Sequence, residues 1–263
     1  TEGSTAAGDA PGTVEFRHVS FRYPNAAADV LHDISFKVEH GGTLAIIGAT
    51  GSGKSTLVGL IPRFYDATAG EVLIDGVNVK DYDFDTLYGK LGYVTQKAVL
   101  FAGTVRDNVF FGKSLAAESD ENLRRALEVS QAAEFVDKLP DGADHKIAQL
   151  GRNVSGGQKQ RLSIARALAR DPEILVFDDS FSALDYRTDA TLRGALAEQM
   201  RDATKIIVAQ RIGTIRHADQ IIVLDHGRAV GIGTHKELMQ TCTVYQEIAR
   251  SQLSAEELER EAG

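Results

Sequence analysis

One eight-residue loop, GATGSGKS from Gly48 to Ser55, constrains the fold of this chain more than any other feature of its sequence. It fits the pattern G-x-x-x-x-G-K-[ST], and it follows the apolar segment TLAII and precedes the helix-like segment TLVGLIPRF, as that pattern requires. The glycines permit a tight loop whose backbone N–H groups converge on phosphate oxygens, and the following helix offers its positive end. Lys54 adds a point charge, and the Ser55 hydroxyl can ligate Mg²⁺. The order of strand, loop and helix predicts an α/β nucleotide-binding fold.

The segments around the loop predict a strand-rich start and a helical insert. VEFRHVSFRY alternates polar and apolar residues, and ISFKVEHGGTLAII continues with a second strand and a turn into a more buried one. EVLIDGVNV predicts a hairpin that turns at Asp75-Gly76. Between about Ser114 and Phe135 the apolar residues recur at helical spacing. The second half alternates short apolar strands, EILVF, TKIIVA and QIIVLD, with helix-like segments, which predicts a parallel sheet covered by helices.

Composition limits the classes of function. The chain has 263 residues, 43% of them hydrophobic, and a formal net charge of -8 with scattered Lys and Arg residues. Nucleic acid is therefore not an expected partner, because binding its backbone needs a concentrated basic face. The single cysteine, Cys242, cannot form an internal disulfide, which favours a reducing compartment. No apolar run approaches the roughly 20 residues of a spanning helix, and no leader pattern is present, so we expect no membrane-spanning segment in the chain as given.

Two further elements lie downstream of the loop. Asp178 follows the apolar strand ILVF and can hold Mg²⁺ through its coordination shell. NVSGGQKQRLSIARAL, residues 153–168, should begin a helix at Ser155 with free N–H groups and a hydroxyl that points outward, which makes a second anion site. One chain cannot easily fold both sites around one phosphate. A second copy that faces it could close its helix end over the nucleotide that the first copy holds.

At these residues the chain resembles the nucleotide-binding domain of ATP-binding cassette (ABC) transporters, specifically the exporter subfamily, over about Val14 to Arg250. VSGGQ matches the signature motif, with Val154 where Leu is usual, and YVTQKAVLFAGTVRDNVFFG is similar to the exporter Q-loop region. VEFRHVSFRYP resembles the adenine-stacking loop, SALD (residues 182–185) the loop that crosses the dimer interface, and ADQIIVLDHGRAVGIGTHKELM the exporter tail, with Gly231 where an acidic residue is common.

The resemblance implies a RecA-like P-loop NTPase core with a mainly parallel sheet, an N-terminal antiparallel β subdomain and an α-helical subdomain. It implies a linker at residues 1–12, a nucleotide-binding domain at 13–250 with the Q-loop and helical subdomain at about 97–165, and a charged helix or tail at 251–263. The implied cofactors are ATP and Mg²⁺. Ser55, Gln96 and Asp178 would serve the metal, and the nucleotide would contact Tyr23, Gly48, Ala49, Thr50, Gly51, Ser52, Gly53, Lys54, Ser55, Thr56, Gln96, Ser155, Gly156, Gly157 and Gln158.

Two positions depart from the family pattern in the composite hydrolytic site. The family places a Glu directly after the Mg²⁺-linked Asp and a His at the end of a later strand, whereas this chain carries Asp179 and Gln210. Asp179 is one methylene shorter, and a displacement of about 1 Å can lower a rate on the order of 10²-fold. Gln210 can donate a hydrogen bond but carries no positive charge. We therefore expect ATP binding to survive better than hydrolysis. The alternative is that the two changes are independent drift in an active enzyme.

This pattern resembles the degenerate half of heterodimeric exporters. It implies an ATPase that is weak at its own site, with Asp179 and Gln210 in the catalytic positions and a signature motif that completes a partner's site. The implied partners are a second nucleotide-binding domain and a transmembrane export domain fused upstream, which would hold the chain at the cytoplasmic side of the cell membrane. A run at Ala148, Gln149 and Leu150 replaces the Gly-Glu-Arg common in exporters. A regulatory module that clamps ATP without turnover and a soluble ABC ATPase remain as alternatives.

Overall fold

The computed structural model describes residues 11–112 and 118–254, which form two compact units. The first unit comprises the chain up to Phe84 and from Thr204 onward, and the second comprises Asp85–Ala203. Most of the linker expected at residues 1–12 and of the tail expected at 251–263 lies outside the described residues, as does part of the expected helical insert. Among the described residues, no helix is both long enough and apolar enough to cross a lipid bilayer.

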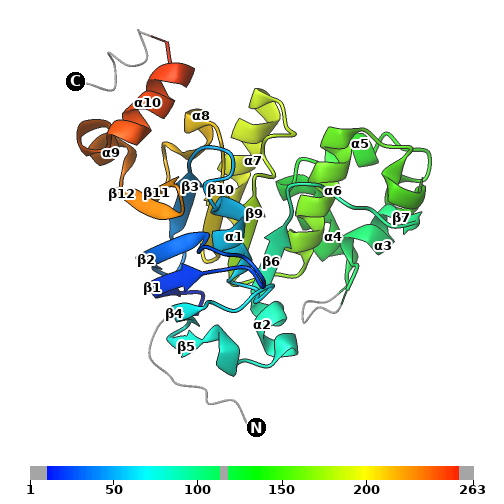
Figure 1. Cartoon of the computed structure of the whole chain (residues 1–263). Helices are drawn as coiled ribbons and strands as arrows, with labels where there is room; N and C mark the ends of the chain where they lie inside the picture. The colour runs from blue at the N-terminus through cyan, green and yellow to red at the C-terminus, as the bar shows by residue number, and fades with distance from the viewer. Residues whose placement is uncertain (1–10, 113–117, 255–263) are drawn as a thin grey trace. The chain divides into compact units, whose positions relative to one another are not determined.

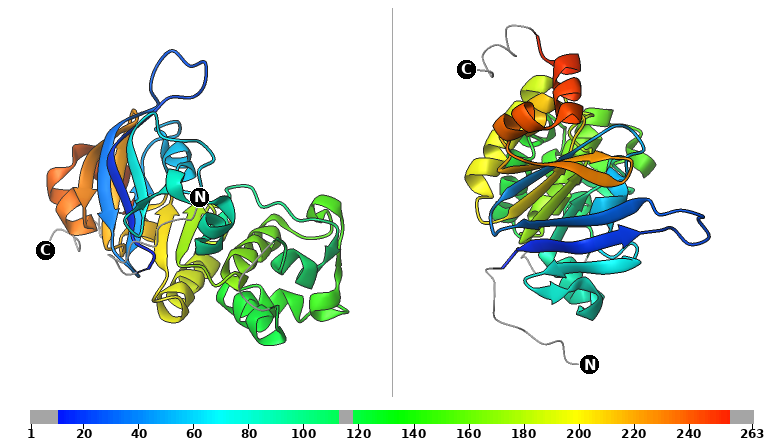
Figure 2. Two further views of the ribbon diagram at one scale, coloured as in Figure 1. Left: turned by 90° about the horizontal axis from the view of Figure 1, so that it is seen from below. Right: turned by 60° about the vertical axis from the view of Figure 1, so that its left-hand side comes forward.

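An antiparallel sheet forms one layer of the first unit (Figure 2, right, blue to cyan). Its strands lie in the order β2-β1-β4-β5, and the predicted turn at Asp75-Gly76 joins β4 to β5 with φ angles of 53° and 74°. Two left-handed residues in succession are typical of a tight hairpin turn, which confirms the expected hairpin. The bounds are β1 Val14–Phe21, β2 Leu31–Val38, β4 Ala69–Ile74 and β5 Val77–Asn78, followed by the 3₁₀ turn η1 Val79–Asp81.

A second, buried layer of the first unit carries the phosphate loop. Strand β3 lies between β10 and β11 and is parallel to both, whereas β12 pairs with β11 in the antiparallel sense. This confirms the parallel arrangement predicted for TKIIVA (β10) and QIIVLD (β11), and TLAII (β3) lies between them. Helices α9 and α10 pack against β12 and β11 (Figure 1, orange to red). The bounds are β3 Thr43–Ile47, β10 Thr204–Val208, β11 Gln220–Asp225, β12 Arg228–Gly233, α1 Lys54–Gly59, α8 Ile212–Ile215, α9 His235–Thr241 and α10 Thr243–Gln252.

The helix after the loop is shorter than the sequence suggested. TLVGLIPRF was expected to continue as a helix, but α1 ends at Gly59. The N–H groups of Leu60 and Ile61 donate to carbonyls three residues back, at 3.3 and 3.2 Å, so the chain tightens into turns. Pro62 explains the change, because its ring disfavours a helical conformation in the preceding residue and it has no N–H group.

The second unit combines a parallel strand pair with a group of helices (Figure 1, cyan-green to yellow). Strand β6 pairs with β9 in register from Leu91↔Ile174 to Val94↔Phe177, while α6 packs against α3, α4 and β6. The short β7 and β8 pair antiparallel. The bounds are α2 Phe84–Lys90, β6 Leu91–Val94, β7 Gly103–Thr104, α3 Val105–Val109, α4 Asp120–Val129, α5 Ala133–Val136, η2 Gly142–Asp144, β8 Lys146–Ile147, η3 Gln149–Gly151, α6 Gly156–Ala169, β9 Ile174–Asp178 and α7 Tyr186–Gln199.

Candidate functional site

The phosphate loop of the first unit curls around the amine of Lys54. Lys54 Nζ donates to the carbonyl oxygens of Gly48 and Ala49, both at 2.8 Å. A Cβ atom on Gly48 would lie 2.1 Å from the carbonyl oxygen of Leu224, so only glycine allows the loop to lie this close to β11. Gly51 has a φ of 81° and open space around its Cα. The loop is therefore closed against the sheet on one side and open on the other.

The residues after the loop connect it to Tyr23. The hydroxyl of Tyr23 lies 2.9 Å from Oγ1 of Thr56, within hydrogen-bonding distance, in the first turn of α1. Ser55 is exposed and Thr56 is half-buried. The structure thus brings the predicted aromatic platform and the predicted phosphate-binding residues together within the first unit.

Gln210 lies two residues after β10 and is exposed. Its carbonyl oxygen accepts a hydrogen bond of 2.7 Å from Nε2 of Gln252, whose Oε1 accepts one of 2.9 Å from the N–H of Ile212. The end of α10 therefore holds the backbone on both sides of Arg211. No local pattern in the sequence signals Gln252, because the contact spans 42 residues.

In the second unit, Asp178 ends β9 and is buried with Tyr93 beside it. The hydroxyl of Tyr93 donates to Oδ2 of Asp178 at 3.4 Å. Burial, and next the charge of Asp178, raise the pKa of Tyr93 well above its usual range, so Tyr93 remains a donor. Tyr93 is not among the predicted site residues, because its position on β6 opposite Val176 of β9 is set by the folded sheet and no local pattern in the sequence signals it.

Asp179 follows β9 in a left-handed conformation, with a φ of 50°, and is 5% exposed. Gln96 Nε2 donates to Oδ2 of Asp179 at 3.0 Å, and the Ser182 hydroxyl donates to its backbone oxygen at 2.7 Å. Among residues with a side chain, Asp and Asn tolerate this conformation best. The side chains of Gln96 and Asp179, predicted as the Q-loop residue and the residue in the catalytic position, are thus in direct contact.

The signature motif begins α6 with a capping box. The N–H of Gln158 donates to the Ser155 hydroxyl at 3.3 Å, and Oε1 of Gln158 accepts from the N–H of Ser155 at 2.9 Å. The Ser155 oxygen, expected to point outward, therefore also caps its own helix, which the spacing S-x-x-Q could have revealed. A Cβ atom on Gly156 would meet nothing within 4 Å, and one on Gly157 would lie 3.7 Å from the carbonyl oxygen of Ala183.

The loop predicted to cross a dimer interface caps the next helix. Oδ1 of Asp185 accepts from the N–H of Thr188 at 3.0 Å, and this hydrogen bond lowers the pKa of the Asp185 carboxyl.

Gly231, which stands where the family often has an acidic residue, also has a structural reason. A Cβ atom on Gly231 would lie 2.8 Å from Sγ of Cys242, so an acidic side chain at that position would collide with α9 and its end.

Comparison with known proteins places this geometry in a family. Residues 31–182, more than half of the chain, match the family model described as ABC transporter. The chain belongs to the ABC transporter family. An uncharacterised ABC transporter ATP-binding protein of Mycobacterium tuberculosis is 48% identical over 92% of this chain, and a Staphylococcus aureus protein provisionally named a multidrug export ATP-binding/permease protein is 43% identical over 90% of it.

The solved structure of a bacterial Atm1-family ABC exporter with ATP bound is similar over 97% of this chain and 44% of its own, with a TM-score of 0.88 and 36% identity. This likeness and the family match confirm the predicted α/β P-loop fold. The chain spans 41% of the length of each of the two curated relatives.

ATP and Mg²⁺ are the cofactors of ABC transporter domains, and the side chains present in this chain fit them. Lys54 supplies an ammonium group, Ser55 an exposed hydroxyl and Gly51 an open backbone position. The Ser52 hydroxyl is buried in the loop without a hydrogen-bond partner among the described residues. Within residues 11–112 and 118–254, no group of three or more His, Cys, Asp and Glu side chains could hold a metal ion.

Proposed function

We propose that this chain is the ATP-binding and ATP-hydrolysing domain of a membrane exporter. The observation that carries the proposal is the intact phosphate loop, in which Lys54 spans the loop by two hydrogen bonds and Gly48 packs against β11. The exporter names of the relatives agree with it. ATP binding would close two such domains on each other, and hydrolysis with product release would reopen them, so closure is the step that performs work.

The chain's own ATP site would hydrolyse slowly. Asp179 reaches less far than the Glu of the family, and its carboxylate already accepts a hydrogen bond from Gln96. Gln210 cannot carry the positive charge that a His can carry. Lys54, Ser55 and Asp178 are unchanged from the family pattern, so Mg²⁺ and ATP would still be held.

The partner would be a second nucleotide-binding domain that has Glu and His at these two positions. The nucleotide-binding domain of this chain would comprise residues 13–250. Its signature motif would reach the ATP that the partner holds and assist its hydrolysis through Ser155, Gly156, Gly157 and Gln158. A transmembrane export domain, fused upstream of a linker at residues 1–12, would attach the chain to the cytoplasmic side of the membrane. The resulting heterodimer would have one slow and one fast site.

A Lys54→Ala substitution tests the role of the loop. It removes the only side-chain cation of the loop, and because charged hydrogen bonds contribute about 1.5–3 kcal/mol each, ATP affinity should fall about 10- to 100-fold. Isothermal titration with ATP and Mg²⁺ measures the change, and Lys159→Ala in α6 is a control outside the loop. Unchanged affinity in Lys54→Ala would refute the proposed phosphate site.

The slow-site proposal is tested by turnover of the chain alone and after mixing with an ABC domain that carries Glu and His. The mixture should hydrolyse ATP at least tenfold faster than this chain alone, because the partner's site then receives the signature motif of α6. An equal rate for the chain alone would contradict the division of roles.

A second candidate, a regulatory module that binds ATP without turnover, is favoured by the contact between Gln96 and Asp179. If Gln96 holds Asp179 at all times, the carboxylate is not available to a water molecule. The two candidates differ in single-turnover hydrolysis. Slow release of phosphate by the isolated chain supports the exporter ATPase domain, and bound ATP that stays intact for hours supports the regulatory module.

A further inference from the structure

The ring of Tyr23 is fixed by two aromatic neighbours in the first unit. The ring centroid of Tyr65 lies 5.0 Å from that of Tyr23 with the planes at 88°, and Phe21 lies at 4.8 Å and 83°. Both are edge-to-face contacts, the arrangement that aromatic pairs prefer. Phe21 and Tyr65 also contact each other, with centroids 5.5 Å apart. The three rings therefore form one cluster.

The two neighbours differ in what else they do. Phe21 belongs to β1 and is 2% exposed, so the core alone accounts for it. Tyr65 comes from the loop between α1 and β4 and is 44% exposed. Tyr65 therefore leaves almost half of its surface exposed, while its ring contacts those of Tyr23 and Phe21.

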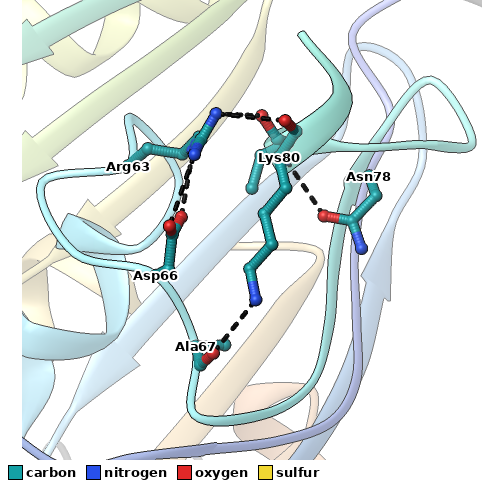
Figure 3. Close-up of polar contacts among 6 residues, drawn as sticks. Arg63, Asp66, Ala67, Asn78 and Lys80 are labelled. Atoms are coloured by element: carbon teal, nitrogen blue, oxygen red, sulfur yellow. Dashed lines mark hydrogen bonds and ion pairs between the residues drawn. The ribbon is translucent and has the colours of Figure 1, made fainter.

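The loop that carries Tyr65 is anchored on both sides of that residue (Figure 3). Arg63 Nε donates to Oδ1 of Asp66 at 2.9 Å, and Arg63 Nη1 donates to the carbonyl oxygen of Lys80 at 3.2 Å. Lys80 Nζ in turn donates to the carbonyl oxygen of Ala67 at 3.2 Å. Two cations therefore tie residues 63–67 to the turn η1, which restricts where the ring of Tyr65 can lie.

The other end of Tyr23 is tied to the phosphate loop. Its hydroxyl lies 2.9 Å from Oγ1 of Thr56, which comes two residues after Lys54. The ring is thus held at its hydroxyl by α1 and at its edge by Tyr65. A ring that is already fixed loses less conformational entropy when a flat ligand stacks on it.

We infer that Tyr65 is a positioning residue for the adenine base of ATP, and that it acts through Tyr23 rather than by touching the base. This inference rests on the proposed function, in which Tyr23 is the adenine platform. Loss of an aromatic pair of this kind should lower the affinity for ATP about 2- to 10-fold. The effect should be confined to ligands with a base, because the phosphate contacts are made by other residues.

The experiment compares two probes, Mg²⁺-ATP and Mg²⁺-tripolyphosphate, by isothermal titration on the full chain. Tyr65→Leu should weaken ATP binding about 2- to 10-fold and leave tripolyphosphate binding unchanged. Tyr65→Phe keeps the ring and should restore ATP affinity. Phe64→Leu is the matched control, since Phe64 is an exposed aromatic of the same loop whose ring is not among the two in contact with Tyr23, and it should leave both affinities unchanged.

The double variant Tyr23→Leu/Tyr65→Leu separates this role from a general structural one. If Tyr65 acts through Tyr23, its substitution should add no further loss of ATP affinity to that of Tyr23→Leu. Additive losses, or an equal loss of tripolyphosphate binding in Tyr65→Leu, would overturn the inference while leaving ATP binding by the chain established. Absence of ATP binding by the unaltered chain would overturn the proposed function and the inference together.

Discussion

The phosphate loop follows strand β3, and Asp179 follows strand β9. Both strands are buried and parallel to a neighbour, yet only the phosphate loop keeps the whole family pattern. At the loop, a Cβ atom on Gly48 would collide with the backbone of β11, and Lys54 joins the two ends of the turn. At the end of β9, Asp179 is short and has a left-handed backbone. The loop belongs to the first unit and Asp179 to the second. If the proposed function holds, the short side chain of Asp179 lowers hydrolysis while the loop keeps its contacts with ATP.

The largest expected effect comes from restoring the family residue after β9. Asp179→Glu extends the carboxylate by one methylene, and because about 1 Å of reach can change a rate on the order of 10²-fold, ATP hydrolysis should rise by up to that factor. The increase should be larger when it is combined with Gln210→His. Phosphate release under saturating Mg²⁺-ATP measures the change, with ATP affinity determined in parallel.

Asp179→Asn is the matched control for that substitution. It keeps the size and the left-handed preference of the side chain but removes the charge, so residual hydrolysis should disappear while ATP affinity stays within about twofold. No gain from Asp179→Glu, alone or with Gln210→His, would mean that the two positions do not limit the rate. The contrast between an intact phosphate loop and a weakened hydrolytic position would then fail.

A second test removes the signature hydroxyl. If the proposed function holds, Ser155→Ala should slow hydrolysis in a partner's site about tenfold, because the proposed hydrogen bond to the partner's ATP would be lost, while ATP binding by this chain's own loop is unchanged. It should also lower the free energy of unfolding by about 1 kcal/mol, because Ser155 caps α6. Turnover of the mixed pair and urea unfolding measure the two effects.

Ser119→Ala separates the cap from the phosphate contact. Ser119 caps α4 by accepting from the N–H of Asn122 at 3.1 Å, so its loss should cost similar stability. The two variants should therefore unfold alike, but only Ser155→Ala should slow the mixed pair. Equal turnover in both would assign Ser155 a purely structural role.

The sequence was sufficient for the parts of the site that depend on local pattern. The phosphate loop, the hairpin at Asp75-Gly76 and the start of α6 all follow from residue types at fixed spacing. It was not sufficient for contacts between distant segments, such as Tyr93 with Asp178 and Gln252 with Gln210, because spacing along the chain carries no information about them. Pro62 indicates the early end of α1, but the apolar pattern that continues past Pro62 favoured a longer helix.

A third, smaller effect is expected for Tyr93→Phe. The substitution removes the hydrogen bond to Asp178, and because such a bond contributes about 0.5–1.5 kcal/mol, the Mg²⁺ concentration that supports half-maximal ATP binding should rise about 2- to 10-fold. Tyr82→Phe is the control, since it also loses a hydroxyl donor, to the carbonyl oxygen of Ile74 at 3.0 Å, but lies far from β9 in sequence. An unchanged Mg²⁺ dependence in Tyr93→Phe would show that Asp178 needs no such support.

The smallest effect concerns the ion pair between Arg63 and Asp66 in the loop that carries Tyr65, and its size depends on pH. The hydrogen bond from Arg63 lowers the pKa of Asp66 below 3.8 in the folded chain, so the ion pair stabilises the fold above the unfolded pKa and is lost as pH falls through the folded one. Asp66 is 48% exposed, so Asp66→Asn should lower the free energy of unfolding at pH 7 by at most about 1 kcal/mol. The difference from the unaltered chain should shrink as the pH falls below 3.8, which urea titrations between pH 7 and pH 3 would measure. Because this ion pair helps to hold the loop that carries Tyr65, ATP affinity should fall slightly with it, whereas the hydrolysis rate of bound ATP should not change. A change in that rate would contradict a role of this ion pair in ATP binding alone.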